Sequence, residues 1–362
     1  MLMSPESIVK MDKSKNRFLI DWFSFSSRVD SFDTFASLLG LSSVKWKIDS
    51  GVRGYSERYS FQGITIHYAG YGGSRFSGTS QEQQVKGAWL EMSGQGCRTY
   101  ETYGLGDWQR LIDYVNFNID NITVNRVDIA YDDFLGYLDI DKIFEDALNL
   151  RFVSRQRNVF TVTSIDTETK ELGKTIAHGK EGSDTYIRIY DKRVEQNAVE
   201  ILDHWVRCEL QLRHKNAAAA IGLLSDEFEI DSKTNKLIKV SDRKPIGELY
   251  FLILNNYLRY IEPSETDSNR WRAPMAEHWK KFAESVTNQR ISLWSSPGID
   301  YSLSRLSNYV INTSGSAIYT YITLFGVDTL VNFVQEKMHI LAPKYKLLLD
   351  YKDDLSGGEI FV

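Results

Sequence analysis

Three segments in which apolar and polar residues alternate constrain the fold of this chain more than any other feature. They are ITVNRVDIAYDD at 122–133, DTYIRIYDK at 184–192 and HWVRCELQLR at 204–213. Successive side chains of a β-strand point to opposite faces, so each segment offers one apolar face and one polar face. The pattern predicts three strands whose apolar faces suit a core.

Other segments predict further strands and helices. Strands are predicted at 18–26, 57–69 and 88–93, the last two as an antiparallel pair joined by a long loop, and helices at 107–118, 140–149, 217–224, 247–261, 273–286 and 324–338. Many short strands with few β-α-β spacings favour an α+β fold with a mainly antiparallel sheet and packed helices over a doubly wound fold. The glycines of SGQGCR, residues 93–98, leave two interpretations open: a positive φ or close backbone approach, or a plain turn.

A change of composition predicts two domains. The polar run PSETDSN at 263–269 indicates a linker, and the segments beyond it have a helical period. We therefore expect a sheet domain over residues 1–262 and a smaller, mostly α C-terminal domain over residues 263–362. No internal repeat is evident in the sequence.

Charge and cysteine content exclude several classes of protein. Lys plus Arg total 43 and Asp plus Glu total 48, a formal net charge of -5, so any contact with nucleic acid must be local. Cys97 and Cys208 both lie in strand-like runs, which argues against a disulfide framework or zinc site and favours a reducing cytoplasm. No stretch approaches the ~18 apolar residues of a membrane span, and the start lacks the apolar region of a signal peptide. We expect neither export nor membrane insertion.

The polar faces of the three alternating segments carry acids, arginines and tyrosines. They hold Arg126, Asp128 and Asp132; Tyr186, Arg188 and Tyr190; and Arg207, Glu209, Gln211 and Arg213. In one sheet this mixture suits a phosphodiester, because carboxylates such as Asp128, Asp132 and Glu209 would hold Mg²⁺ or Mn²⁺ while arginines clamp phosphates. A tyrosine could attack phosphorus once its phenol, with a reference pKa near 10, is deprotonated. The same pattern also describes the solvent-facing side of any antiparallel sheet, with cross-strand Arg–carboxylate pairs, and this alternative stays open.

Signatures of other enzymes are missing from the sequence. Gly173-Lys174-Thr175 ends like a Walker A loop, but Glu168 stands where the first glycine should be, so nucleotide binding is rejected. There is no His-hydrophobe-His pair for a two-histidine metal site, and no GxSxG.

A set of motifs in a fixed order over residues 18–215 resembles a known family. The motifs are IDWFSFS at 20–26, LEMSGQGCR at 90–98, NRVDIAYDD at 125–133, TYIRIYDKRVEQ at 185–196 and DHWVRCELQLR at 203–213. Together they resemble the plasmid and phage initiators of the Rep_trans, or replication initiation factor, family, which nick DNA for rolling-circle replication. The length and the SGQGCR element are most similar to filamentous-phage replication proteins of the RstA type.

The resemblance implies roles for particular residues. Tyr190 would be the nucleophile, and Asp128, Glu209 and Asp132 would lie at the site of a Mg²⁺ or Mn²⁺ ion; Asp133 replaces Asp132 if a bulge shifts the register. Basic side chains in and beside the motifs are expected to contact DNA: Arg126, Arg188, Lys192, His204, Arg207 and Arg213, with Arg75 in the glycine-rich loop at 70–78. A second basic stretch over residues 233–244 is either a contact to duplex phosphates or a solvated loop.

The resemblance also implies a reaction. Tyr190 would cut one strand of an origin duplex, form a 5′-phosphotyrosyl link and release a 3′-hydroxyl for a host polymerase, with a host helicase as a further partner, in the cytoplasm of a bacterial cell. A conjugative-transfer relaxase would use the same chemistry, and a non-catalytic origin-binding regulator would keep only the fold; a homodimer stays open. The aromatic share of 13% suits base stacking by single-stranded DNA as well as core packing.

Overall fold

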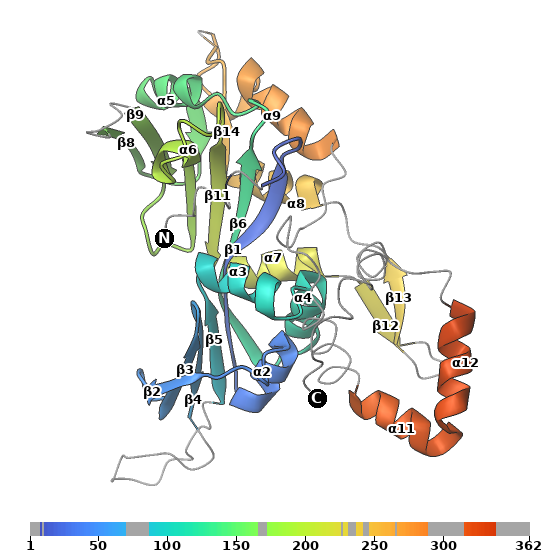
Figure 1. The fold of residues 1–362 in the computed structure, drawn as a ribbon. Coiled ribbons are helices and arrows are strands. Elements are labelled where there is room, and N and C mark those ends of the chain that lie inside the picture. The colour runs from blue at the N-terminus through green and yellow to red at the C-terminus, as the bar shows by residue number, and fades with distance from the viewer. Residues whose placement is uncertain are drawn as a thin grey trace.

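The fold is α+β, as the sequence predicts, and is built on one large antiparallel sheet (Figure 1). The computed structural model describes Ile8 and residues 11–69, 87–165, 172–225, 227–230, 237–241, 246–264, 266–288 and 315–337. Ten of the described strands form the sheet in the order β2-β3-β4-β5-β1-β6-β11-β10-β9-β8. Their bounds are β1 (Arg17–Ser27), β2 (Lys47–Ser50), β3 (Glu57–Phe61), β4 (Ile64–Tyr68), β5 (Ala88–Met92), β6 (Ile122–Asp133), β8 (Val159–Ile165), β9 (Leu172–His178), β10 (Thr185–Asp191) and β11 (Val206–Arg213).

Smaller strand pairs and helices complete the described structure. The pairs are β7 (Phe152–Ser154) with β14 (Leu258–Tyr260), and β12 (Glu227–Ile230) with β13 (Leu237–Ser241). The α-helices are α2 (Phe32–Leu39), α3 (Gly94–Tyr103), α4 (Trp108–Phe117), α5 (Ile140–Leu148), α6 (Lys192–Glu195), α7 (His214–Leu224), α8 (Ile246–Tyr257), α9 (Glu277–Asn288), α11 (Gly315–Phe325) and α12 (Val327–Lys337).

The sheet consists of two halves with the same strand order, although the sequence shows no repeat. In the first half, β1 is followed by α2 and by the meander β2 to β5, whose last strand returns to pair with β1. In the second half, β6 is followed by α5 and by the meander β8 to β11, whose last strand returns to pair with β6. The two long strands β1 and β6 pair antiparallel at the centre. The order of strands is therefore the same from either edge of the sheet.

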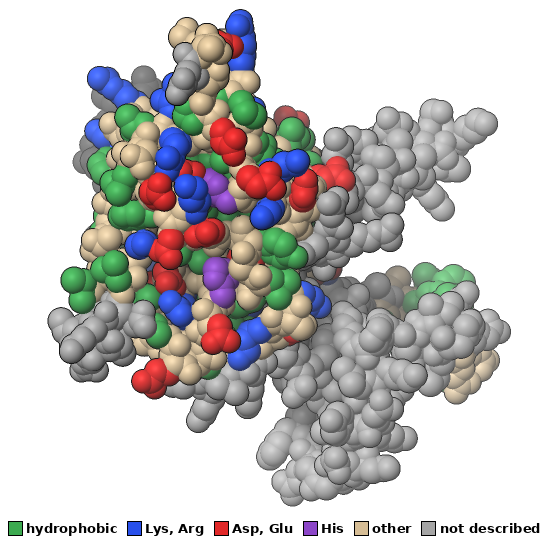
Figure 2. All heavy atoms as spheres, turned by 90° about the horizontal axis from the view of Figure 1, so that it is seen from above, with side chains coloured by type: hydrophobic (Ala, Val, Ile, Leu, Met, Phe, Trp, Pro, Cys, Tyr) green, Lys and Arg blue, Asp and Glu red, His purple; other side chains and the backbone are tan. Residues whose placement is uncertain are grey.

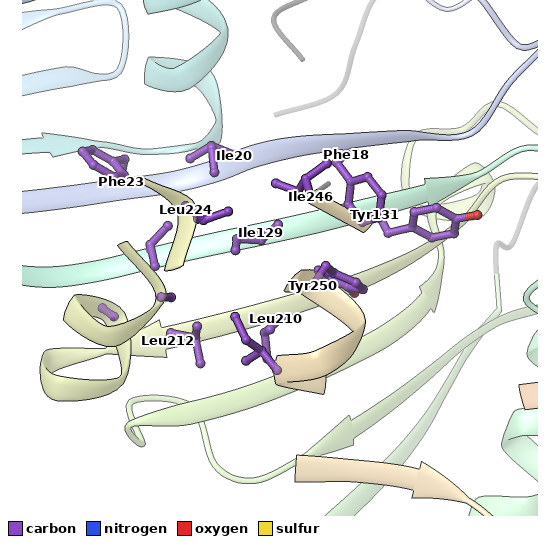
Figure 3. Packing of buried hydrophobic residues seen from close by; sticks show 14 of the residues in the cluster. Phe18, Ile20, Phe23, Ile129, Tyr131, Leu210, Leu212, Leu224, Ile246 and Tyr250 are labelled. Carbon is purple, nitrogen blue, oxygen red and sulfur yellow. The ribbon is translucent and has the colours of Figure 1, made fainter. Parts of the chain in front are cut away.

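The core lies on one face of this sheet, under the helices. Apolar side chains at alternate positions of the central strands point toward α7 and α8 (Figure 3). Buried side chains of α4 and α9 belong to the same cluster. Phe23, Ile129 and Leu210 illustrate the pattern, each with no exposed surface. Burying such a side chain contributes about 1.5 to 3 kcal/mol, so the period-two pattern is the main force that fixes which face is inward. The residues between them form the opposite, polar face.

The contacts of α9 bear on the predicted domain boundary. Trp279, Phe282 and Val286 are fully buried in the core of the sheet. The helix that follows the predicted linker thus packs on the sheet domain, while the division at residues 262 and 263 stays a prediction.

Most of the predicted strands and helices are present in the described residues, with several differences. The helix predicted at 247–261 ends at Tyr257, and Leu258–Tyr260 forms β14 instead, paired with β7. Residues 57–69 form two strands instead of one, because Gln62 and Gly63 make a turn with positive φ. The SGQGCR tract starts α3, where Ser93 is the N-cap and the backbone of Gly96 approaches so closely that a Cβ there would lie 2.2 Å from the Gly63 carbonyl oxygen. Close approach is therefore correct and a positive φ is not. The sequence analysis missed β8 and β9, and the rejected nucleotide-binding motif lies inside β9.

Charges of both signs are mixed on the described surface, and the prediction that both cysteines lie in strands is wrong for Cys97, which lies in α3. The end of the molecule near α5 and α9 carries acidic and basic side chains side by side (Figure 2). Cys97 and Cys208 are buried free thiols. Within the described residues, the helices are too short or too polar to cross a bilayer.

Candidate active site

The candidate site lies on the polar face of the second half, where β6, β11 and β10 are neighbours. The register places Arg207 opposite both Asp132 and Tyr190, and Glu209 opposite Arg188. Side chains directly opposite each other share a face. The alternation in the sequence therefore brings these five predicted residues onto one surface.

Tyr190 and Glu209 are in direct contact at this surface. The Tyr190 hydroxyl lies 3.4 Å from Oε2 of Glu209. The Glu209 carboxylate also accepts hydrogen bonds from Arg188 through both of its oxygens, each at 2.8 Å. Tyr190 is 8% exposed and lines a pocket of about 390 Å³ together with Arg188 and Glu195. The phenol is thus beside a carboxylate and at a hollow in the surface.

The environment of Tyr190 keeps its phenol protonated in the free protein. Burial raises the pKa of Tyr190 well above its usual value, the Arg207 guanidinium lowers it, and the Glu209 carboxylate raises it. The Lys192 ammonium lies 5.5 Å and the Arg188 guanidinium 5.4 Å from the ring centroid. A phenolate at this position would be stabilised by these cations.

Asp128 is the second acid of the site. It is 1% exposed, and Oδ1 accepts from Nε of Arg126 at 2.8 Å. Burial raises the pKa of Asp128 to about 7, Arg126 lowers it, and Glu209 and Asp21 raise it. Asp128 and Glu209 are therefore close enough to repel each other, although each is paired with one arginine.

Asp132 is held by two arginines in a fully buried cluster. Arg207 donates to both of its oxygens, at 2.6 and 3.0 Å, and Arg17 of β1 donates to Oδ2 at 2.9 Å. Burial acts to raise the pKa of Asp132, but Arg207 and Arg17 outweigh it and hold the pKa well below the usual value. Arg207 also donates to Asp21 at 2.8 Å. The alternative interpretation from the sequence, cross-strand Arg–carboxylate pairing, thus describes part of this face correctly.

The donor set can be compared with what a divalent cation requires. Carboxylate oxygens suit Mg²⁺ and Mn²⁺. Asp128 and Glu209 fit, because their mutual repulsion is what a bound cation would relieve. All three acids have both oxygens bound by guanidinium groups. Asp128 and Glu209 are each bound by one arginine, which a cation could displace, whereas Asp132 is fully buried and bound by two, so Asp132 does not fit in this arrangement. Among the described residues, no group of three or more His, Cys, Asp or Glu side chains has a metal-site arrangement.

The remaining predicted residues lie at different distances from this cluster. The pairing of β6 with β11 has no register shift, so Asp133 is on the opposite face from Asp132 and accepts instead from His204 at 3.1 Å and from backbone N–H groups. Lys192 is buried beside Tyr190, and Arg213 is half-buried at the far end of β11. Arg75 and the side chains of the basic stretch at 233–244 lie outside the described residues.

Sequence analysis missed Asp21 and Arg17, which β1 contributes to the site. Asp21 lies where the pairing of β1 with β6 shifts register between Ile20 and Trp22. Such a shift turns an extra side chain toward the neighbouring strand. The sequence offered one signal for Asp21, which is an acid among the aromatic residues of IDWFSFS. The face that Asp21 occupies depends on the register shift between two strands, and this shift cannot be predicted from the sequence of one strand.

The chain is similar in sequence and in fold to known proteins. The sequence model described as Replication initiation factor matches residues 122–334, and the model described as Rolling Circle replication initiation protein N-terminal domain matches residues 17–117. A putative DNA relaxase, NicK, from Bacillus subtilis (strain 168) is 27% identical over 312 residues, which cover 83% of this chain and 79% of the relative. The solved structure of a rolling circle replication initiator protein from Geobacillus stearothermophilus has a TM-score of 0.62 at 24% identity, and the match covers 78% of this chain and 100% of that one.

Proposed function

The chain belongs to the replication initiation factor family, and from this premise we propose that it is a metal-dependent nickase that cuts and rejoins one DNA strand through Tyr190. The observation that carries the proposal is the contact between the Tyr190 hydroxyl and Glu209 on the face that also holds Asp128. The closer likeness to RstA-type phage proteins stays a prediction.

The proposed reaction begins with loss of the phenolic proton. Glu209 is the carboxylate 3.4 Å from the hydroxyl and would accept this proton, while Arg207 and Lys192 stabilise the phenolate. The phenolate oxygen then bonds to phosphorus as the bond from phosphorus to the 3′-oxygen breaks. The products are a 5′-phosphotyrosyl link and a 3′-hydroxyl, which needs one proton. A second transesterification in reverse rejoins a strand without ATP.

Charge on the phosphate has to be stabilised as the new bond forms. Arg188 lines the pocket beside Tyr190 with a partly exposed guanidinium, and would bind a phosphate oxygen there. Asp128 and Glu209 would hold a Mg²⁺ or Mn²⁺ ion, which would withdraw charge from a non-bridging oxygen. We leave Asp132 out of the proposed ligands and assign it to holding Arg207.

A transfer role is the second candidate, and the relaxase NicK favours it. A relaxase would cut the transfer origin of a conjugative element with the same residues. The two roles differ in the DNA that is cut. Nicking of plasmid libraries that carry either replication or transfer origins would separate them.

A denaturing gel after incubation with supercoiled origin DNA and Mn²⁺ tests the chemistry. We expect a covalent protein–DNA adduct from the wild type and from Tyr186→Phe, and a loss of at least about 1,000-fold in adduct for Tyr190→Phe. Tyr186 is the matched control, because it lies on the same strand and face. An undiminished adduct from Tyr190→Phe would show that another residue is the nucleophile.

A further inference from the structure

The polar face continues from the candidate site into the first half of the sheet. There the register places Ser24 of β1 opposite both Arg126 and Glu91, and Trp89 of β5 opposite His67. These side chains therefore share a face with Asp128 and Glu209. The side chains on this polar face change from carboxylates and a phenol in the second half to indole rings and arginines in the first half.

The rings of this region have fixed positions. Trp89 stacks on His67 with a centroid distance of 4.4 Å and an interplanar angle of 16°, and its indole N–H donates to the Ser24 hydroxyl at 2.9 Å. Burial lowers the pKa of His67, and its Nδ1 is buried without a hydrogen-bond partner in the part of the chain that the structure describes, so the ring that stacks on Trp89 is neutral. Trp22 of β1 lies under the Arg126 guanidinium at 4.2 Å. Both indoles are half-buried, so part of each remains in contact with solvent.

Three arginines surround these rings. Arg53 lies 5.2 Å from the Trp89 ring centroid. Burial raises the pKa of Glu91, whereas Arg53, Arg126 and Arg213 lower it, which places all three guanidinium groups near this one acid. Nε of Arg213 is buried and has no hydrogen-bond partner among the described residues. Glu91, Asp128 and Glu181 lie near these arginines as well, and Arg126 is paired with Asp128, so the region is rich in guanidinium groups without a large excess of positive charge.

We propose that this surface, defined by Trp22, Trp89, Arg53, Arg126 and Arg213 and here named the indole surface, binds single-stranded DNA beside the cleavage site. Unpaired bases have free faces that stack on indoles, and guanidinium groups bind the phosphates between them. A duplex has no free base faces, so its contacts here would be limited to phosphates.

The position of the indole surface suits a strand that also reaches Tyr190. Trp22 is on β1, three strands away from β10, and the register places it in line with Tyr186, four residues before Tyr190. At about 4.8 Å per strand and about 3.3 Å per residue, the separation from Tyr190 is about 20 Å. A few nucleotides span such a distance. The inference rests on the proposed function, because it concerns the strand that Tyr190 would cut.

Binding of single-stranded DNA by full-length protein tests the proposal without cleavage. In a Tyr190→Phe parent, we expect Trp22→Ala and Trp89→Ala each to raise the Kd for a labelled origin-strand oligonucleotide by about 5- to 150-fold. Trp22→Phe and Trp89→Phe, which keep a ring, should lose much less. Phe117→Ala is the matched control, since Phe117 is 70% exposed on α4, which packs on the other face of the sheet. It should leave the Kd unchanged.

Two further measurements locate the contact. 2-Aminopurine placed at successive positions of the oligonucleotide should be quenched at one or two positions beside the nick site, and this quenching should disappear in Trp22→Ala. Arg213→Gln should reduce the slope of log K against log salt by about one.

The outcomes distinguish this inference from the proposed function. If both folded Trp→Ala variants bind the oligonucleotide as tightly as the parent, or lose affinity only for duplex DNA, the indole surface is not a single-strand site. If an alanine variant does not fold, the quenching map of the parent and the salt slope of Arg213→Gln decide: no quenched position beside the nick site and an unchanged slope would refute the single-strand site. An adduct formed by the Tyr190→Phe parent would refute the nucleophile and leave the binding result valid.

Discussion

The two halves of the sheet have the same strand order but carry chemically different side chains at matching positions. Glu91 of β5 and Glu209 of β11 each lie on the strand that pairs with the long strand of its half. Across from Glu91 on the next strand is Thr65, while across from Glu209 is Arg188. Two residues further along these strands are His67 in the first half and Tyr190 in the second.

The comparison separates what the topology determines from what the side chains determine. Both halves place an acid on the polar face near the centre of the sheet. Among the described residues, only the acid of the second half accepts hydrogen bonds from a phenol and a guanidinium, and there it lies in a cluster where carboxylates repel each other. In the first half, the matching positions hold stacked rings. The fold thus provides two similar surfaces, of which we assign one to cleavage and one to holding the strand.

Exchanging the two matching acids for amides should give the largest difference between the halves. We expect Glu209→Gln to slow nicking by about 100- to 10,000-fold, because it removes the acceptor for the Tyr190 proton and a proposed metal ligand. Glu91→Gln should stay within about threefold, since Glu91 lies on the other half of the sheet. The measurement is the nicking rate at saturating DNA. Equal losses in both variants would mean that the halves do not differ in this way.

Asp132 should matter for stability more than for chemistry. Asp132→Asn leaves Arg207 and Arg17 without their buried partner, and breaking such a pair typically costs about 3 to 5 kcal/mol in the free energy of unfolding. Asp49→Asn in the first half is the control, because Asp49 pairs with Lys47 and Arg58 near the surface and should cost far less. Urea denaturation measures both. Unchanged stability of Asp132→Asn, with altered metal dependence, would return Asp132 to the metal ligands.

The sequence predicts the site better than it predicts the sheet. Alternation alone placed Asp128, Tyr190 and Glu209 on polar faces, because the identity of the neighbouring strand does not change which side chains point outward. It could not reveal that Arg17 and Asp21 join the site, since this depends on the pairing of β1 with β6 and on a register shift between them.

Edge strands and turns account for the other omissions. Strand β8 is a sheet edge with Phe160, Val162 and Ile165 exposed, so it lacks the buried face that makes a strand recognisable in sequence. The turn at Gln62 and Gly63 was hidden because apolar residues continue on both sides of it. The repeated strand order was also hidden, since the matching positions carry different side chains.

Buried histidines should give the smallest effect near pH 7, and a pH dependence of stability in acid to which each half contributes. Burial lowers the pKa of His178 in β9 to about 3, and Nε2 lies 3.1 Å from the Tyr260 hydroxyl. Below pH ~6.5 the unfolded chain takes up a proton that folded His178 cannot, so the free energy of unfolding falls by about 1.4 kcal/mol for each pH unit down to about pH 3. His178→Gln removes this group, so we expect a shallower decline than in the wild type over this range, measured by urea denaturation at several pH values.

His67→Gln should change the slope in the same direction, because burial also lowers the pKa of His67. Parallel curves for wild type and His178→Gln would mean that His178 is protonated without unfolding, so that the second half opens locally before the sheet unfolds.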